Sequence, residues 1–391
     1  MLSFLSKSLR RNPYPTYAFM RKAAPVLHDR LHDLWMVFDY DSVRMAITDH
    51  EAFSSRAAAP GSDPLDWLIF SDQPRHTKLR SIIMKAFTPR AIASLEPRIR
   101  ELSSELLDQS IANGEMDVVT DFSAVLPLLV IAEMLGIPLE DRPRFKLWSE
   151  AINSLSDTIW GGEIAAAALR EHARARDQIR EYLSKVLEER RASPKNDLLT
   201  RLVEAEVDGE RLVEDEILSF FQLLLVAGSE TTTNLISSMI LCLIENRDQL
   251  ESLRAEPELL PAAIEEVLRY RSPVQAVFRQ TRRDVKVHGR IIPEGKLVLA
   301  VIGAANRDPR QFPNASRFDI ERNPNPHIAF GHGINFCLGA SLARLECRIA
   351  ISDFLCRVET FELADRRGWE PRKAFHVHGP SSLRIQFDRT E

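Results

Sequence analysis

The chain has 391 residues, of which 45% are hydrophobic and 27% charged, and its formal net charge is −5. This balance is ordinary for a globular protein with a large core, and the acidic net charge argues against general nucleic-acid binding. The sequence contains no repeat, low-complexity tract or glycine–serine linker, so we expect one domain over residues 1–391.

Cysteine usage and the N-terminal residues bear on the compartment. Cys337, Cys347 and Cys356 lie along one predicted helix at spacings too long for a disulfide, and Cys242 is remote in sequence. No C-x-x-C pair suggests zinc, so we expect a reducing, cytoplasmic compartment. Residues 1–7 are too short and polar to span a bilayer or to form a signal-peptide core, which predicts no membrane anchor.

The N-terminal part of the chain mixes short elements with one loop. We expect a helix over residues 16–24, a strand over 34–38, a helix over 41–49 and a loop over 57–64. The apolar cluster that follows, with Trp67 and Leu68, is equally consistent with plain core and with a functional surface. A helix from Gln73 to Phe87 then places His76 and Arg80 on one face, which by itself indicates only a solvated basic surface.

Residues 92–203 are almost all helical in pattern. The breaks fall near Asn113-Gly114, Gly136-Ile137-Pro138 and residues 193–196. Trp160-Gly161-Gly162 separates two of the predicted helices. The glycine pair suits the hinge of a lid, and an ordinary helix connection explains it at least as well.

A long apolar helix is predicted over residues 212–245. A membrane span is the rival interpretation, but Glu230 lies at mid-helix, where a carboxylate costs roughly 2.5–3.5 kcal/mol in lipid. We therefore expect a helix buried in a globular protein. The centre of this helix contains glycine and threonine, which are poor helix formers; it reads A-G-S-E-T-T from Ala227 to Thr232. Such a conflict marks either a functional groove, with Gly228 admitting a ligand, or a harmless polar patch.

Shorter elements follow this helix. Glu266 and Arg269 share one face of a helix over residues 261–270, a spacing that alone indicates a surface ion pair. The predicted strands are a hairpin over residues 285–292, a buried strand over 296–302 and a strand pair over 372–387 with a turn at Gly379-Pro380.

The stretch from Phe330 to Gly339 reads F-G-H-G-I-N-F-C-L-G and leads into a helix over residues 340–358. Cys337 therefore lies where unpaired N–H groups and the helix dipole stabilise a thiolate. The glycines allow the backbone to bend or to approach a flat group. A single thiolate with small and aromatic neighbours indicates an axial haem ligand; the alternative is a buried cysteine in a glycine-containing turn.

This stretch resembles the cysteine loop of the cytochrome P450 family, the haem-thiolate monooxygenases. Four further features stand in the family's order: the helix with His76 and Arg80, the A-G-x-[D/E]-T groove at Ala227, the E-x-x-R pair and Arg317. The resemblance covers essentially the whole chain. It implies a mainly α, single-domain cytochrome P450 fold with small β-sheets, of the soluble bacterial type, and the hydrophobic periodicity independently predicts the same excess of helices.

The resemblance also implies roles for individual residues. Cys337 would be the axial ligand of the haem iron, and Glu230 and Thr231 would relay protons to oxygen. The implied haem contacts are Ala227, Gly228, Phe330, Gly331 and Gly339. His76, Arg80 and Arg279 would donate hydrogen bonds to the haem propionates. Asn335 stands where the family usually has histidine or arginine, and it would be a weaker, neutral donor to a propionate. Glu266, Arg269 and Arg317 would be structural. The implied substrate pocket includes Trp67, Leu68, Trp160, Leu224, Val274, Phe375 and Val377.

The implied cofactors are haem b (iron protoporphyrin IX) and O2. Electrons would pass from NAD(P)H through a reductase and a small acidic ferredoxin, which we expect to dock on a positive patch of Lys78, Lys85, Arg90, Arg344 and Arg348. The expected reaction inserts one oxygen atom into a C–H or C=C bond of a lipophilic small molecule, and we expect a monomer. The alternatives are a peroxide-driven hydroxylase and a non-catalytic haem-binding sensor, which have less use for Glu230 and Thr231.

Overall fold

The computed structural model describes residues 6–56, 66–155, 162–365 and 368–389. Their contacts group the chain into a sheet unit (Met1–Ala57, Ser103–Ser123 and Thr231–Glu391) and a helical unit (Ala58–Leu102 and Ala124–Glu230). Helices α6 (Glu96–Ile111) and α11 (Glu214–Glu245) each belong partly to one unit and partly to the other. Trp160 and the loop predicted over residues 57–64 lie outside the described residues.

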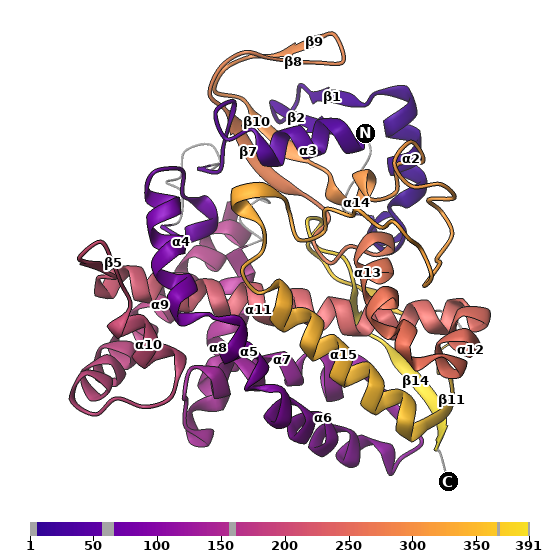
Figure 1. The fold of residues 1–391 in the computed structure, drawn as a ribbon. Helices are drawn as coiled ribbons and strands as arrows, with labels where there is room; N and C mark the ends of the chain where they lie inside the picture. Colours follow the sequence, from indigo (N-terminus) through magenta and orange to yellow (C-terminus); the bar gives the residue numbers. More distant parts are fainter. Residues whose placement is uncertain (1–5, 57–65, 156–161, 366–367, 390–391) are drawn as a thin grey trace. The chain divides into compact units, whose positions relative to one another are not determined.

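Helices make up most of the helical unit (Figure 1). Its other elements are α4 (Arg75–Ala86), α5 (Pro89–Ala93), α7 (Val125–Met134), α8 (Arg142–Asn153), α9 (Gly162–Ala192), α10 (Leu198–Glu204), the hairpin of β5 (Glu206–Val207) and β6 (Glu210–Arg211), and short turns at Leu68–Phe70 and Leu139–Asp141. Asp197 begins α10 by accepting a hydrogen bond from Thr200 N at 2.8 Å, and it is also ion-paired with buried Arg190 at 2.6 Å. The cap therefore ties the end of α9 to the start of α10.

The sheet unit combines helices with short strands (Figure 1). Its helices are α1 (Lys7–Arg11), α2 (Tyr14–Ala23), α3 (Tyr40–Thr48), α12 (Arg247–Ala255), α13 (Leu260–Tyr270), α14 (Ile302–Ala305) and α15 (Ala340–Arg357). Its strands are β1 (Val26–Asp29), β2 (Leu34–Val37), β3 (Phe53–Ser54), β4 (Glu115–Asp117), β7 (Val277–Thr281), β8 (Val285–Val287), β9 (Arg290–Ile292), β10 (Leu297–Ala300), β11 (Val358–Leu363), β12 (Glu370–Pro371), β13 (Pro380–Ser382) and β14 (Arg384–Arg389). The predicted mainly helical fold with small sheets is confirmed.

The largest sheet has the strand order β1-β2-β10-β7-β3, with β2 and β10 parallel and the other pairs antiparallel. Successive side chains of a strand point to opposite faces. Val298 and Ala300 accordingly pack into one hydrophobic cluster, and Leu299 and Val301 into another. Because both faces are buried, β10 reads as a continuous apolar run in the sequence.

The C-terminal strands differ from the prediction. The expected strand pair with a turn at Gly379-Pro380 is wrong, because β13 begins at Pro380 and pairs with β12, and β14 pairs with β11 and β4. The preceding residues hydrogen-bond elsewhere: His378 N donates to Pro273 O at 2.9 Å, and Gln275 N donates to His376 O at 2.7 Å. Hydrogen bonds between residues far apart in the sequence are thus formed instead of the predicted local hairpin.

Glu266 and Arg269 form a fully buried ion pair on α13, with both hydrogen bonds at 2.7 Å. The role predicted for Arg317 is wrong, because its side chain is exposed and it contributes its backbone carbonyl, which accepts from Arg269 Nη2 at 3.0 Å. The third side chain is Arg322, whose Nε lies 3.1 Å from Glu266 Oε2. A buried carboxylate needs several donors to offset its desolvation, and these two guanidiniums supply them.

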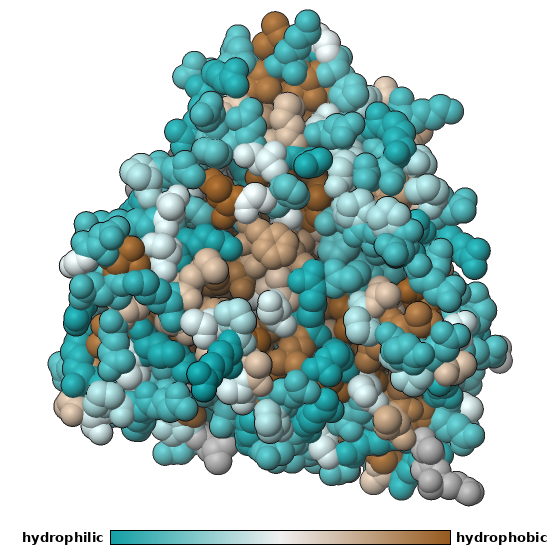
Figure 2. All heavy atoms as spheres, in the orientation of Figure 1, coloured by the Kyte–Doolittle hydropathy of each residue, from teal (hydrophilic) through white to brown (hydrophobic). Residues whose placement is uncertain are grey.

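Hydrophilic side chains predominate on the face shown in Figure 2, with hydrophobic residues in separate spots. Among the described residues, no helix combines the length and the apolar character that a bilayer-spanning segment requires.

Candidate functional site

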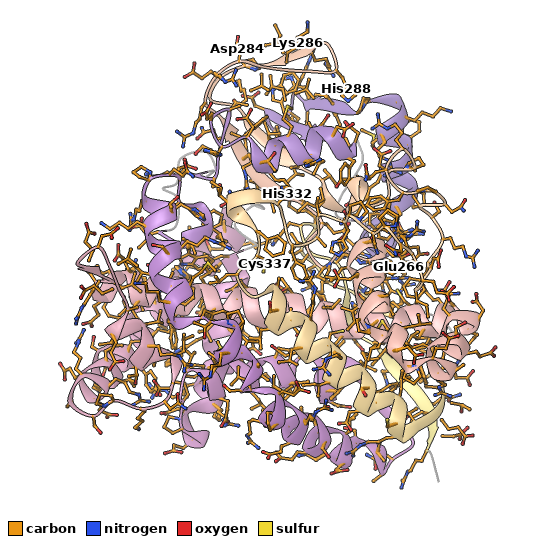
Figure 3. The ribbon with its side chains drawn as sticks, viewed as in Figure 1. Glu266, Asp284, Lys286, His288, His332 and Cys337 are labelled. Atoms are coloured by element: carbon orange, nitrogen blue, oxygen red, sulfur yellow. The ribbon has the colours of Figure 1, made fainter. Side chains whose placement is uncertain are left out.

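Cys337 lies just before α15, on the loop that contains the turn Gly333–Asn335 (Figure 3). Its backbone N–H donates to Phe330 O at 2.8 Å, which closes the loop. Gly331 has a φ of +73°, and an added Cβ there would lie 3.2 Å from the Asn335 carbonyl oxygen. Both conformation and space therefore require glycine. The Cys337 thiol is exposed at the surface of the protein chain, so its sulfur is accessible to a ligand.

An accessible stripe runs along one face at the centre of α11. Leu224, Ala227 and Thr231 follow one another at spacings of three and four residues, so they share a face, and none of them is buried. Thr232 and Thr233 are only 3% and 2% exposed. Of the three consecutive threonines, Thr231 is therefore the one that can meet a ligand, as the sequence comparison with the family suggested.

Gly228 has a packing role that was not predicted. A Cβ at this position would lie 2.7 Å from Ile131 Cδ1 of α7, within the helical unit. Gly228 therefore allows α7 and α11 to pack closely, and its contact with a haem stays a prediction.

His76 and Arg80 lie on successive turns of α4. His76 is 2% exposed and its Nδ1 has no hydrogen-bond partner, which is costly for a buried polar atom. Burial lowers the pKa of His76, and the positive charge of Arg80 lowers it further. A buried donor without a protein acceptor, beside a guanidinium, fits an anionic group that does not belong to the chain.

Arg279 and Asn335 lie in the sheet unit. Arg279 is on β7, largely buried, and donates to Phe278 O at 2.7 Å. Asn335 Nδ2 donates to Ser55 Oγ at 3.3 Å, so this neutral side chain is held by a hydroxyl. A guanidinium and a side-chain amide are both hydrogen-bond donors, so both residue types suit an anionic group.

The residues predicted to line a substrate pocket have different surroundings in the two units. Val274 and Val377 pair through an isolated bridge, and Phe375 packs 6.3 Å from Phe278, measured between ring centroids. In the helical unit, Trp67 and Leu68 are buried, and Leu224 belongs to the accessible stripe of α11. Packing against the core thus explains part of this set, and only Leu224 shares a face with a predicted catalytic residue.

A charged cluster beside the cysteine loop was not predicted. Glu265 accepts hydrogen bonds from Arg344 Nε at 2.6 Å and Arg344 Nη2 at 2.8 Å, and its Oε2 lies 3.0 Å from His327 Nε2. The Arg344 guanidinium carbon lies 4.5 Å from the ring centroid of Phe330. The cluster therefore links α13, the cysteine loop and α15. Glu265 precedes the E-x-x-R glutamate, but only the fold brings Arg344 to it.

This cluster also changes the predicted positive patch. Arg344 is neutralised by Glu265, Lys78 is ion-paired with Glu210, and Lys85 Nζ donates to Glu206 O at 2.7 Å. These three cations thus interact within the chain, which weakens the electrostatic argument for that docking surface.

We expect Glu265→Gln to lower the stability of the protein by on the order of 2 kcal/mol at pH 7, since it leaves Arg344 partly buried without its counter-charge. Burial raises the pKa of Glu265, but hydrogen bonds from Arg344 and His327 outweigh it and bring the pKa from 4.5 to about 2. The ion pair therefore stabilises fully above pH 4.5, and its contribution is lost as the pH falls toward 2. Chemical unfolding should show the variant closest to wild type in acid; a pH-independent difference would contradict this account.

The comparisons with known proteins cover nearly the whole chain. Residues 25–375 match the family model described as Cytochrome P450. The cytochrome P450 protein YjiB of Bacillus subtilis is 43% identical over 99% of this chain and 96% of its own. The crystal structure of CYP109E1 from Bacillus megaterium in complex with testosterone is 39% identical, with a TM-score of 0.88 over 96% of this chain and 99% of that one. CYP109B1 from Bacillus subtilis gives the same TM-score at 41% identity, over 96% of this chain and 100% of that one.

Fold and site together define a haem-thiolate enzyme. The chain belongs to the cytochrome P450 family, is a cytochrome P450 monooxygenase, and resembles bacterial members of the CYP109 type. The described residues fit the haem that the family implies: an accessible thiol at Cys337, a buried unpaired nitrogen at His76, and open space within 4 Å of an added Cβ at Gly339. They include no cluster of three or more metal-binding side chains.

Proposed function

We propose that this enzyme inserts one oxygen atom from O2 into a C–H or C=C bond of a lipophilic small molecule. In this proposal residues 1–391 act as a single domain, Cys337 is the axial ligand of haem b, and electrons from NAD(P)H arrive through a separate ferredoxin. The observation that carries it is the accessible stripe of α11, which includes an alcohol, Thr231, and has an acid, Glu230, as the partly exposed neighbour of that residue in an apolar helix.

When bound, a thiolate-ligated haem supplies the activation of O2 and the transfer of one oxygen atom to the substrate. The chain's residues do the remaining work. Cys337 provides an anionic sulfur, and the rings of Phe330 and Phe336 on the same loop lie 6.2 Å apart, measured between ring centroids. Glu230 takes protons from solvent and Thr231 passes them, through water, to the reacting oxygen. His76, Arg80, Arg279 and Asn335 would hold the two propionates of the haem when it is bound.

A lipophilic substrate is supported by the apolar side of the stripe, Leu224 and Ala227. CYP109E1 was crystallised with testosterone and with corticosterone, which makes steroids a sensible first set for a ligand screen. Binding would shift the haem absorption band, so a screen can identify ligands before the reaction is known.

The peroxide-driven alternative differs from this proposal in the source of the oxygen atom. The sensor alternative differs in forming no oxygenated product. With reductase, ferredoxin, NADPH and a ligand from the screen, we expect the product to gain one oxygen atom from ¹⁸O-labelled O2, with the second appearing in water. Incorporation from added H2O2 alone, with none from labelled O2, would favour the peroxide-driven reaction. No product from either source, despite tight binding, would favour a sensor.

A further inference from the structure

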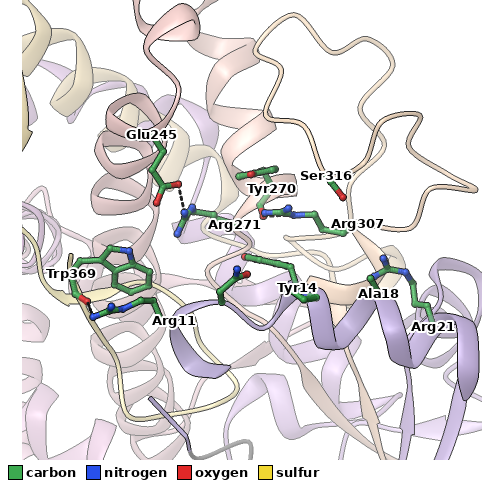
Figure 4. A pocket seen from close by; sticks show the side chains of 12 residues that line it. Arg11, Tyr14, Ala18, Arg21, Glu245, Tyr270, Arg271, Arg307, Ser316 and Trp369 are labelled. Atoms are coloured by element: carbon green, nitrogen blue, oxygen red, sulfur yellow. Dashed lines mark hydrogen bonds and ion pairs between the residues drawn. The ribbon is translucent and has the colours of Figure 1, made fainter. Parts of the chain in front are cut away.

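A cavity of about 470 Å³ lies in the sheet unit, between the N-terminal helices and the ends of α11 and α13 (Figure 4). None of the residues assigned above to haem or substrate lines it. The charged side chains that do are Arg11, Arg21, Arg271, Arg307 and Glu245. Four arginines against one glutamate leave three positive charges in excess, in a protein whose net charge is −5.

Arg307 carries a buried charge with neutral partners. It is 8% exposed, and its guanidinium carbon lies 3.8 Å from the ring centroid of Tyr14 and 3.4 Å from that of Tyr270. Its Nε and Nη2 both donate to Tyr270 O, at 2.8 and 2.6 Å. Cation–π contacts and a carbonyl stabilise a guanidinium, but they supply no counter-charge. Burial lowers the pKa of Arg307, and the neighbouring Arg271 adds to the effect.

Arg271 is also 8% exposed, and Glu245 is its ion-pair partner. Of the described residues that line the cavity, this glutamate alone carries a carboxylate, so it offsets a single guanidinium. The Nε of Arg271 is buried and has no hydrogen-bond acceptor among the residues that the structure describes. Figure 4 shows the Arg307 guanidinium between the rings of Tyr270 and Tyr14, with Arg271 and Arg21 on either side of this stack.

Arg21, on α2, extends the positive lining. Its Nη1 donates to the Ala304 carbonyl at 2.7 Å. Asp308 attracts Arg21 electrostatically, but it is itself ion-paired with Arg310 at 2.7 Å. The lining therefore presents fixed, hydrogen-bonded guanidiniums whose charge the described side chains only partly balance.

We propose that this cavity binds a phosphate group, free or carried by a small phosphomonoester, as the counter-ion of Arg21, Arg271 and Arg307. Guanidiniums recognise phosphate through charge-assisted hydrogen bonds. The volume of about 470 Å³ exceeds a phosphate ion and lies in the range of small-molecule sites, so it leaves room for an esterified part against the Trp369 and tyrosine rings. This site is independent of the proposed reaction.

The test is a thermal-unfolding titration of the haem-loaded full chain. Inorganic phosphate should raise Tm saturably, beyond sodium chloride at equal ionic strength, because a ligand that binds only the folded state stabilises it. Glycerol 3-phosphate and AMP at matched ionic strength distinguish the sources: a lower half-saturation concentration than for phosphate identifies an esterified ligand. Citrate acting more strongly than all three phosphates would overturn the assignment in favour of a carboxylate site.

Two variants test the location. Arg21→Gln should raise the half-saturation concentration about tenfold, the loss of one charge-assisted hydrogen bond. Ser316→Glu, at an exposed lining residue, places a negative charge in the cavity and should abolish the phosphate effect. Arg384→Gln, at an exposed arginine of β14, should titrate as wild type. Phosphate and chloride acting alike on wild type, or both cavity variants titrating normally, would overturn the proposal, whatever the haem spectrum shows.

Discussion

Replacement of Cys337 by alanine is expected to abolish the strongly red-shifted Soret band that thiolate-ligated haem gives in its reduced, carbon monoxide-bound form. The reason is geometric: Cys337 is the exposed thiol on a loop that its own N–H closes onto Phe330 O, immediately before α15. Without a sulfur at that position the chain offers no anionic axial ligand there. We expect loss of the band to be complete and haem retention to fall.

Cys356 provides the matched control. It is an exposed cysteine too, but it lies near the end of α15 and not on the loop before the helix. Cys356→Ala should leave the band unchanged. If Cys337→Ala kept the red-shifted band, another side chain would have to be the ligand and the site would be misplaced.

The features predictable from the sequence are those that depend on neighbours along the chain. The helix after Cys337 was expected over residues 340–358 and spans Ala340–Arg357, because its apolar spacing and preceding glycine are local signals. The predicted hairpin at 285–292 is present as β8 and β9 for the same reason. The family resemblance relied in addition on the order of the motifs along the chain, which cannot be recognised from any one of them alone.

The features that escaped prediction depend on residues far apart in sequence. Arg322, and not Arg317, completes the buried Glu266 cluster, since the loop after α14 decides which guanidinium reaches the carboxylate. Gly228 serves the packing of Ile131, a residue nearly a hundred positions away, so its local pattern could not reveal its role. The same holds for Arg344, which the sequence suggested to be a surface cation. Its ion pair with Glu265 makes it part of the cluster that links the cysteine loop to α13 and α15.

Thr231→Ala is expected to separate oxygen consumption from product formation. Thr231 lies on the accessible stripe of α11 beside Glu230, and removal of its hydroxyl interrupts the proposed delivery of protons. The variant should bind substrate and consume O2 at close to the normal rate. Most of the reducing equivalents should then appear as hydrogen peroxide, and product per NADPH should fall about tenfold or more. Added peroxide should partly restore product, since it brings oxygen that is already reduced.

Thr232→Ala is the control that makes this result specific to one face of the helix. It removes the same atoms one residue further along, about 100° around the axis, from a side chain that is only 3% exposed. We expect it to retain normal coupling, with at most a modest loss of stability. The measurement is the ratio of product formed to NADPH consumed, together with the peroxide released. Equal coupling in wild type, Thr231→Ala and Thr232→Ala would show that the threonines only pack the helix, and the peroxide-driven and non-catalytic alternatives would gain accordingly.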